Sequence, residues 1–281
     1  MTQEPLIVLT YPGHFMLTAL TIQSYLQHHT PPDIVIVVDD ISLHAWPEYV
    51  DDCKNFYKQK IVPASSLEFL KNESSGWLRQ QLLKLHLDQL TNFSSWFFTD
   101  GDIVFRYPAP KQTIPYSIVR GELVRERQNN FVKHMLGLST VGIWAQHPDI
   151  DWVSDNTTQV CVSNPPFRSM SAQDLAALRT YVEQQHRQSF CDAWVSATTR
   201  LDCSVSEWEL LENFKTHVQQ QPSLLTYYPT CPKDHVKTKQ SDPDFCEHYF
   251  VSDAEFGRDE LAKLNIEVTD QLWQRLEKIS K

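Results

Sequence analysis

The sequence predicts an α/β protein in which helices flank a mixed, mainly parallel sheet. Over about the first hundred residues, apolar strand-like runs alternate with stretches of helical spacing, and this alternation is typical of a layered fold with parallel strands. The run Ile34-Val35-Ile36-Val37-Val38 is β-branched without a polar break, as expected for a strand covered on both faces. After residue 115 the pattern becomes irregular. We expect a single domain over residues 1–281, with a regular half at 1–115 and an irregular half at 116–281.

The elements of the regular half follow from their patterns in order. Residues 6–9 predict a short apolar strand, closed by the turn Tyr11-Pro12-Gly13. Apolar residues recur at helical spacing over residues 14–28, and Pro31-Pro32 ends that helix. The β-branched strand ends in Asp39-Asp40. Three further strands are expected at residues 60–63, 96–99 and 103–105, and one leucine-rich helix at residues 77–90.

The irregular half carries fewer clear elements. Residues 116–124 predict one or two short strands. A helix over residues 172–188 begins with the capping pattern Ser171-Ala-Gln-Asp174. A second helix is expected to begin near Ser204, and a last helix to cover residues 259–278.

The composition excludes several functions. Lys and Arg number 25 against 35 Asp and Glu, a formal net charge of −10, so nucleic acid and anionic membranes are not expected as partners. The seven glycines form neither a dinucleotide fingerprint nor a P-loop. The six cysteines are scattered without a Cys-x-x-Cys pair, which argues against a zinc ribbon. With no signal-peptide pattern and no transmembrane run, we expect free thiols in a cytoplasmic protein.

The motif Asp100-Gly101-Asp102 directly follows an apolar strand. A turn at Gly101 could bring both carboxylates around one hard cation, Mn²⁺ or Mg²⁺, with phosphate and water as the remaining ligands. Ligands of α/β folds gather at the carboxyl ends of strands, which favours this interpretation. A simple surface turn is the alternative, because Asp-Gly is a common hairpin signal.

The strand, the Asp-x-Asp motif and the following Ile103-Val104-Phe105 resemble the metal-binding motif of GT-A glycosyltransferases, which use nucleotide sugars as donors. Residues 76–85 and 206–214 also resemble elements of a poorly characterised bacterial and viral group with this fold. The chain departs from that group at Trp208 and Leu211, where the group has tyrosines. No motif covers the C-terminal third.

The resemblance implies a GT-A-like domain with a nucleotide-binding half at residues 1–115 and an acceptor-side half at 116–281. It implies a hexosyl- or pentosyltransferase that moves a sugar from a UDP- or GDP-sugar to a hydroxyl of a glycan acceptor, with inversion. The two motif aspartates would hold the metal on the diphosphate and offset the charge of the leaving group. Thr10, Asp39 and Asp100 would contact the donor.

The leucine-rich helix keeps one polar stripe, which contains Trp77, Gln80, Gln81, Lys84 and Asp88. A helix otherwise sheathed in leucine buries such a stripe against something polar. The resemblance places this helix beside the nucleotide, so Gln80 and Lys84 are candidate donor contacts. A partly solvated helix face is the alternative.

Three glutamates, Glu207, Glu209 and Glu212, follow Ser204 and Ser206. Both serines have a glutamate three residues later, as in a capping box, so helix capping is one role. The other role is a general base that removes a proton from the acceptor hydroxyl, as inverting transfer requires. The resemblance favours Glu207 for it.

A histidine could supply a third metal ligand, since some GT-A enzymes have one in the C-terminal region. His217, His235 and His248 are the candidates. His235, in a loop among prolines, suits the role best, and a surface imidazole is the alternative.

Two other functions fit parts of the sequence. A nucleotidyltransferase also uses paired aspartates on an α/β sheet, although it usually has a glycine-rich N-terminal loop, and Gly13 is the one glycine before residue 76. A non-catalytic sugar-binding module or degenerate transferase would keep the fold without turnover. Hydrolysis of the donor separates an enzyme from such a module.

Overall fold

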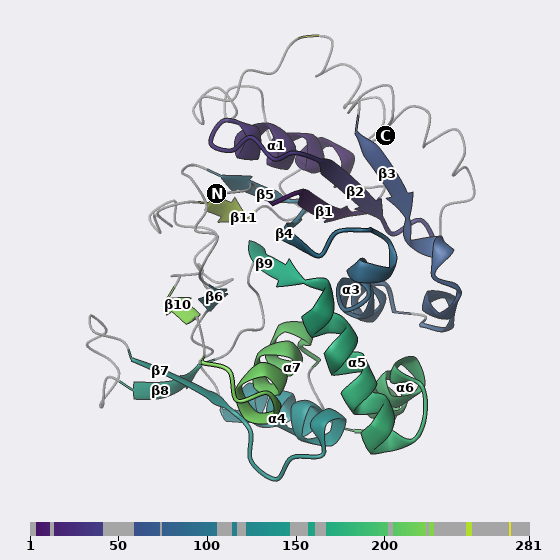
Figure 1. The fold of residues 1–281 in the computed structure, drawn as a ribbon, viewed down its shortest axis with the longest axis vertical. Coiled ribbons are helices and arrows are strands. Elements are labelled where there is room, and N and C mark those ends of the chain that lie inside the picture. The colour runs from purple at the N-terminus through teal and green to yellow at the C-terminus, as the bar shows by residue number, and fades with distance from the viewer. Residues whose placement is uncertain are drawn as a thin grey trace. The chain divides into compact units, whose positions relative to one another are not determined.

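A computed structural model describes the chain in twelve stretches, residues 4–11, 14–41, 59–73, 75–105, 114–116, 122–146, 157–160, 167–201, 205–222, 225–227, 246–248 and 270 (Figure 1). Internal contacts divide the chain into two compact units. Unit 1 comprises residues 1–66, 95–111 and 238–281, and unit 2 comprises residues 67–94 and 112–237. This division differs from the expected boundary at residue 115, because residues 67–94 leave the regular half and join unit 2.

Four strands of the main sheet belong to unit 1, and they confirm the predicted α/β class with a mainly parallel sheet. They are β1 (Leu6–Thr10), β2 (Ile34–Val38), β3 (Lys60–Pro63) and β4 (Ser95–Asp100), in the order β3-β2-β1-β4 (Figure 1). All three pairings are parallel. Every residue of β1 and β2 is buried, as the apolar run of β2 predicts for a strand covered on both faces.

Helix α1 (Phe15–Leu26) packs on this sheet and on β5 (Ile103–Phe105), the strand that follows β4 in the chain. Hydroxyl groups of α1 accept the backbone N–H groups of β5, with distances of 3.1 Å from Ile103 N to Thr21 Oγ1 and 3.0 Å from Phe105 N to Ser24 Oγ. Strand β11 (Cys246–His248) pairs antiparallel with β5, and the 3₁₀ turn η2 (Ala64–Ser66) follows β3. The helix predicted at residues 14–28 and the strands predicted at 60–63, 96–99 and 103–105 are confirmed.

Unit 2 is mainly helical in the part that the structure describes. Its helices are α3 (Gly76–Lys84), α4 (Glu122–Leu136), α5 (Ala172–His186), α6 (Phe190–Arg200) and α7 (Glu207–Asn213). Its short strands are β6 (Ile114–Tyr116), β7 (Ile143–Gln146), β8 (Thr157–Val160), β9 (Phe167–Ser171) and β10 (Leu225–Tyr227). Single turns are η3 (Glu68–Asn72), η4 (Leu87–Gln89) and the π-type turn η5 (Phe214–Val218).

The predicted elements of unit 2 are confirmed in part. The Ser171 hydroxyl accepts the Asp174 N–H at 3.4 Å and caps α5, as its sequence predicts. The leucine-rich helix is shorter than predicted, because the chain tightens into η4 after Lys84 and the His86 ring bonds the Leu82 carbonyl. The strand prediction is wrong where it reached residues 122–124, which begin α4.

Two helices differ from the sequence prediction in other ways. Helix α6 was not predicted, although its buried residues Phe190, Ala193, Trp194 and Ala197 have helical spacing. The predicted helix at residues 259–278 lies outside the described residues except at Asp270, which is helical. Among the described helices, none is both long and apolar enough to cross a membrane.

Candidate functional site

The carboxyl ends of three parallel strands bring predicted site residues of unit 1 to one edge of the sheet. In the register, Thr10 is the partner of Val38, the residue before Asp39, and Leu9 is the partner of Asp100. The Asp39 N–H donates to the Thr10 carbonyl at 2.9 Å. Thr10, Asp39 and Asp100 therefore gather where α/β sheets bind their ligands.

Gly101 fixes the backbone between the two motif aspartates. Its N–H donates to the Leu9 carbonyl at 2.8 Å, which ties the turn to the end of β1. A Cβ at this position would lie 2.6 Å from Thr18 Oγ1 and 3.0 Å from the Leu9 oxygen, closer than real side chains approach. A larger side chain would force Thr18 or the end of β1 to shift, so the turn is clasped by β1 and α1 rather than being a loose surface hairpin.

A polar cluster surrounds this turn. The Tyr11 hydroxyl contacts His14 Nε2, and the Thr10 and Thr18 hydroxyls lie 2.6 Å apart. Burial raises the pKa of Tyr11 to about 12, and the negative charge of Asp102 adds to the rise, which places the Asp102 carboxylate within electrostatic reach of the phenol. Asp102 is half-buried, as is Asp100.

The donor set of this edge suits a hard divalent cation. Asp100 and Asp102 supply carboxylate oxygens, the atoms that Mg²⁺ and Mn²⁺ prefer. Within the described residues, no group of three or more His, Cys, Asp or Glu side chains is placed to hold a metal. The two aspartates could hold such an ion together with phosphate and water oxygens.

The three candidate histidines have different surroundings. His235 lies outside the described residues. His248 is the register partner of Ile103, so its backbone lies beside the residue that follows Asp102. His217 belongs to unit 2, where its Nε2 donates to the Gly142 carbonyl at 2.9 Å.

Asp40, the neighbour of Asp39, has a structural role. It is 4% exposed and accepts the Ser65 N–H at 2.8 Å and the Ser65 hydroxyl at 2.5 Å. These two bonds cap the turn η2 after β3. Asp39 is also buried, at 6% exposed, and its backbone N–H bonds the Thr10 carbonyl at the ends of β1 and β2.

In unit 2, the polar stripe of α3 meets α7. Lys84 Nζ lies 3.1 Å from Glu207 Oε1, and the two side chains are 7% and 1% exposed. With its amide nitrogen turned toward α7, Gln81 donates to both oxygens of Glu207, at 2.5 Å for Oε1. Lys84 also lies over the Trp208 ring, 5.5 Å from its centroid. The structure thus places Lys84, a predicted donor contact, in an ion pair with Glu207, the predicted base.

The remaining residues of the polar stripe differ in their exposure and in their partners. Gln80 is half-buried, and Trp77 is 55% exposed. Arg79, off the stripe, is buried and donates to the Glu73 carbonyl at 3.3 Å. Asp88, beyond the end of α3, forms an ion pair with Arg179.

The other two glutamates of α7 are also buried and partnered. Glu212 pairs with Arg168, which is 1% exposed and stacks over Trp208 at 4.8 Å. Nε and Nη1 of Arg168 have no hydrogen-bond partner in the described structure. Glu209 accepts the Asn213 side-chain amide at 3.0 Å, and its N–H is capped by Ser206 at 3.2 Å. The capping interpretation of this segment is therefore confirmed for Ser206.

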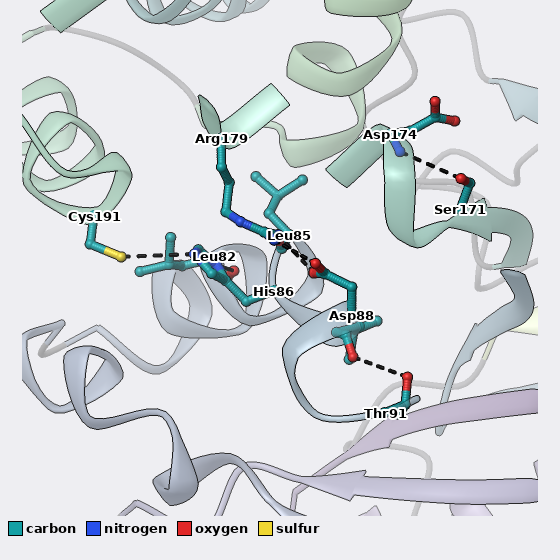
Figure 2. A network of polar contacts seen from close by, with 10 residues as sticks. Leu82, Leu85, His86, Asp88, Thr91, Ser171, Asp174, Arg179 and Cys191 are labelled. Carbon is teal, nitrogen blue, oxygen red and sulfur yellow. Dashed lines mark hydrogen bonds and ion pairs between the residues drawn. The ribbon is translucent and has the colours of Figure 1, made fainter. Parts of the chain in front are cut away.

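A second polar network, shown in Figure 2, anchors the end of α3 to α5. Arg179 of α5 donates to the Leu85 carbonyl at 2.5 Å and to both oxygens of Asp88 at 2.7 and 2.5 Å. His86 Nδ1 bonds the Leu82 carbonyl at 2.8 Å, and its Nε2 lies 3.9 Å from the sulfur of Cys191, a free thiol.

Both members of the last contact are neutral. Burial lowers the pKa of His86 to about 3 and raises the pKa of Cys191 to about 12. This network is structural, and sequence reasoning missed it because its residues come from three separate segments.

Comparisons with known proteins give weak likenesses. No family model matches the chain, and no curated protein matches it in sequence. Among solved structures, the chain is similar to the glycosyltransferase GlyE of Streptococcus pneumoniae TIGR4, with 8% identity and a TM-score of 0.42 over 99% of this chain and 63% of that one. It is similar to the inositol-1-phosphate CTP transferase of T. maritima, with 11% identity and a TM-score of 0.41 over 100% of this chain and 98% of that one.

Mouse xyloside xylosyltransferase 1 is a further example, with 11% identity and a TM-score of 0.40 over 85% of this chain and 91% of that one. The chain spans less than two thirds of the length of the pneumococcal protein.

Proposed function

We propose that the chain is a metal-dependent glycosyltransferase of the GT-A type, which transfers a hexose or pentose from a nucleotide-diphosphate sugar to a hydroxyl of a glycan. The observation that carries the proposal is the clasped turn Asp100-Gly101-Asp102 at the carboxyl edge of a parallel sheet. A closely packed glycine, at which a Cβ would force its neighbours to shift, lies between two half-buried carboxylates, and this supports a ligand-binding turn over a surface hairpin.

The residues of this edge have distinct proposed roles. Asp100 and Asp102 hold Mn²⁺ or Mg²⁺, which when bound offsets negative charge on the diphosphate leaving group. Thr10 and Asp39 contact the UDP or GDP part of the donor. His235 is the proposed third ligand, and His248, whose backbone pairs with Ile103, is the alternative.

Glu207 is the proposed base of an inverting transfer, and it contacts Gln81 and Lys84 of α3. Gln80 and Lys84 of the same helix are the proposed contacts to the donor. The Lys84 ammonium at 3.1 Å favours the ionised carboxylate that a base requires. The same pairing also supports the alternative, in which Glu207 only holds α3 to α7.

Calorimetric titration of the full chain with UDP and GDP, with and without Mn²⁺, tests the central proposal. We expect one nucleotide to bind at least about tenfold more tightly with Mn²⁺, and Asp102→Asn to abolish that gain. Asp33→Asn is the matched control, because Asp33 is an exposed carboxylate at the opposite end of β2. An unchanged Mn²⁺ gain in Asp102→Asn contradicts the proposed metal site.

Product analysis separates the related functions. Release of free sugar from a UDP- or GDP-sugar identifies a glycosyltransferase, since transferases leak sugar to water. Release of pyrophosphate from a nucleoside triphosphate identifies a nucleotidyltransferase. Metal-dependent binding without either product identifies a non-catalytic sugar-binding protein.

A further inference from the structure

The hydroxyl group of Thr18 lies where two turns of the candidate site meet. Thr18 is fully buried in α1. Its hydroxyl donates to the His14 carbonyl at 2.9 Å and lies 2.6 Å from the Thr10 hydroxyl. A hydroxyl has one proton to donate, and that of Thr18 goes to His14, so Thr10 is the donor in the second bond. A helical threonine often bonds the carbonyl four residues earlier, whereas the bond to Thr10 ties α1 to the end of β1.

The Asp-Gly-Asp turn packs against the same oxygen atom. A Cβ built on Gly101 would lie 2.6 Å from Thr18 Oγ1 and 3.0 Å from Thr10 Cβ. The Gly101 N–H donates to the Leu9 carbonyl at 2.8 Å, so the turn is bonded to β1 and in close contact with α1. The two threonines therefore limit the positions that this turn, and with it the carboxylates on either side of the glycine, can take.

The turn that follows β1 depends on Thr18 as well. The His14 carbonyl accepts the Thr18 hydroxyl, and the His14 N–H donates to the Tyr11 carbonyl at 2.9 Å. The Tyr11 hydroxyl contacts Nε2 of the same histidine, and the centroids of the two rings lie 3.7 Å apart. One buried hydroxyl thus connects the turn after β1 to the Asp-Gly-Asp turn.

We propose that Thr18 is a positioning residue for the metal and nucleotide site. Because it is fully buried, it acts through the two turns that it contacts. Its hydroxyl fixes these turns relative to each other, so that Asp100 and Asp102 are held in place before the ion and the diphosphate bind. Preorganised groups bind more tightly because less conformational freedom is lost on binding. This assignment deepens the proposed function and rests on it.

The test compares Thr18→Ala, which removes the hydroxyl, with Thr18→Ser, which keeps it. Both substitutions lose the same methyl group. Ser24→Ala is the matched control, because Ser24 is a buried residue of the same helix whose hydroxyl donates to the Thr21 carbonyl at 3.0 Å and accepts the Phe105 N–H at 3.0 Å. Calorimetric titration with UDP and GDP in the presence of Mn²⁺ measures the nucleotide affinity, and thermal melting shows that each variant is folded.

The expected loss of affinity is confined to one variant. Thr18→Ala should bind nucleotide with Mn²⁺ at least about fivefold more weakly, and Thr18→Ser and Ser24→Ala should stay within about twofold of the wild type, since one buried hydrogen bond contributes roughly a factor of five. Thr18→Ala and Ser24→Ala should lower the melting temperature to a similar extent, because each removes one buried hydroxyl. A loss of affinity in Thr18→Ala alone therefore reports on the site and not on stability.

Amide hydrogen exchange of the free protein keeps this inference separate from the proposed activity. Asp100-Gly101 is the only Asp-Gly step in the sequence, so labelling aspartate carbonyl carbons and glycine nitrogens identifies the Gly101 amide by NMR. With no metal or nucleotide present, this amide should exchange at least about tenfold faster in Thr18→Ala than in the wild type, because the turn opens more often. Thr18→Ser and Ser24→Ala should exchange like the wild type.

Three results overturn the positioning role. If Thr18→Ala keeps the wild-type affinity for nucleotide with Mn²⁺, the hydroxyl does not position the site. If Ser24→Ala loses as much affinity, the stability of α1 explains the effect. If Thr18→Ser binds as weakly as Thr18→Ala, the methyl group matters and the hydroxyl does not. A wild type that binds neither nucleotide overturns the proposed function and with it the role of Thr18 at that site, while the exchange rates still show whether Thr18 fixes the turn.

Discussion

Two groups of acidic side chains, one in each unit, are held in different ways. In unit 1, Asp100 and Asp102 are half-buried at the edge of a sheet, on a turn fixed by Gly101. In unit 2, the three glutamates of α7 are at most 5% exposed, and each has a cationic or amide partner.

This difference separates the acids that we propose to bind a ligand, Asp100 and Asp102, from the acids of α7 that hold the fold. Removing a carboxylate from water costs several kcal/mol unless a partner offsets it, so the α7 acids are tied to Lys84, Arg168 and Asn213. Asp100 and Asp102 keep part of their surface exposed. By its burial, Glu207 belongs with the acids that hold the fold. By its proposed role as a base, it belongs with the acids of the ligand site, so it offers the sharpest test.

A double substitution tests whether Glu207 is more than a structural acid. Glu207→Gln alone would leave the Lys84 ammonium buried without its carboxylate, so loss of folding would obscure loss of catalysis. Lys84→Met with Glu207→Gln removes both charges together, which is often close to neutral for stability. If Glu207 is the base, turnover at saturating donor should fall by about 10² to 10⁴, whereas the nucleotide affinity of the double variant reports separately on Lys84.

Lys84→Arg serves as the control for this experiment, because it keeps the ion pair and should keep turnover. Near-normal turnover in the double variant would assign Glu207 wholly to the structural group. A loss of nucleotide affinity in that variant would instead support the predicted donor contact of Lys84.

Loss of Arg168 should show how much unit 2 depends on its buried pairs. Arg168→Met leaves Glu212 buried without its cation, and we expect the free energy of unfolding to fall by about 3–5 kcal/mol. The control is Lys71→Met, which breaks the ion pair between Lys71 and Glu68, whose side chains are 50% and 84% exposed. That pair should contribute less than about 1 kcal/mol. Urea denaturation of both variants gives the comparison, and equal losses would contradict it.

Gly101→Ala tests the backbone clasp in unit 1. The added methyl group would collide with Thr18 and the end of β1, at a cost of about 1–3 kcal/mol. The shift of both aspartates should also weaken Mn²⁺-dependent nucleotide binding. Gly76→Ala, where a Cβ meets only a flexible side-chain tip, should cost nothing measurable. Calorimetry and thermal melting of the two variants check this, and a clasp that tolerates alanine would restore the surface-turn interpretation.

The smallest expected effect concerns the neutral imidazole in unit 2. Burial lowers the pKa of His86 to about 3, below its unfolded value of about 6.5. The unfolded chain therefore binds the proton more readily, and stability is lost as the pH falls below about 6.5. Between pH 7 and pH 6 this group should remove about 0.7 kcal/mol.

His86→Asn, which can still donate to the Leu82 carbonyl, should flatten the pH dependence of unfolding over this range. The difference between the two proteins isolates His86 from the other histidines. Parallel curves for wild type and variant would show that His86 is not the titrating group.

The strands and the site edge of unit 1 could be predicted because their signals are local. The β-branched run of β2 predicts a buried strand, and the apolar spacing of α1 predicts a helix with one buried face. The motif Asp100-Gly101-Asp102 follows its strand directly in the sequence. The clasp itself could not be predicted, since it depends on where Leu9 and Thr18 come to lie in space.

The pairing of α3 with α7 was beyond the sequence for the same reason. The polar stripe correctly predicted a polar partner, but Glu207 is distant in the chain and the resemblance suggested a nucleotide in its place. The register of His248 with Ile103 likewise depends on a strand pairing of two distant segments. The missed helix α6 did carry a signal, the helical spacing of its buried residues.

The interruption of unit 1 by residues 67–94 has a consequence for folding. Helix α3 leaves the ribosome long before α7, the helix that satisfies its Gln81 and Lys84. Until then, α3 lacks its contacts with α7, and it carries the apolar residues Leu82 and Leu83, which are at most 1% exposed in the finished protein. Contacts between distant segments form slowly, and apolar surface exposed meanwhile promotes aggregation. A fragment that ends at residue 115 would contain the four parallel strands of unit 1 but would aggregate through α3 rather than fold as an independent half.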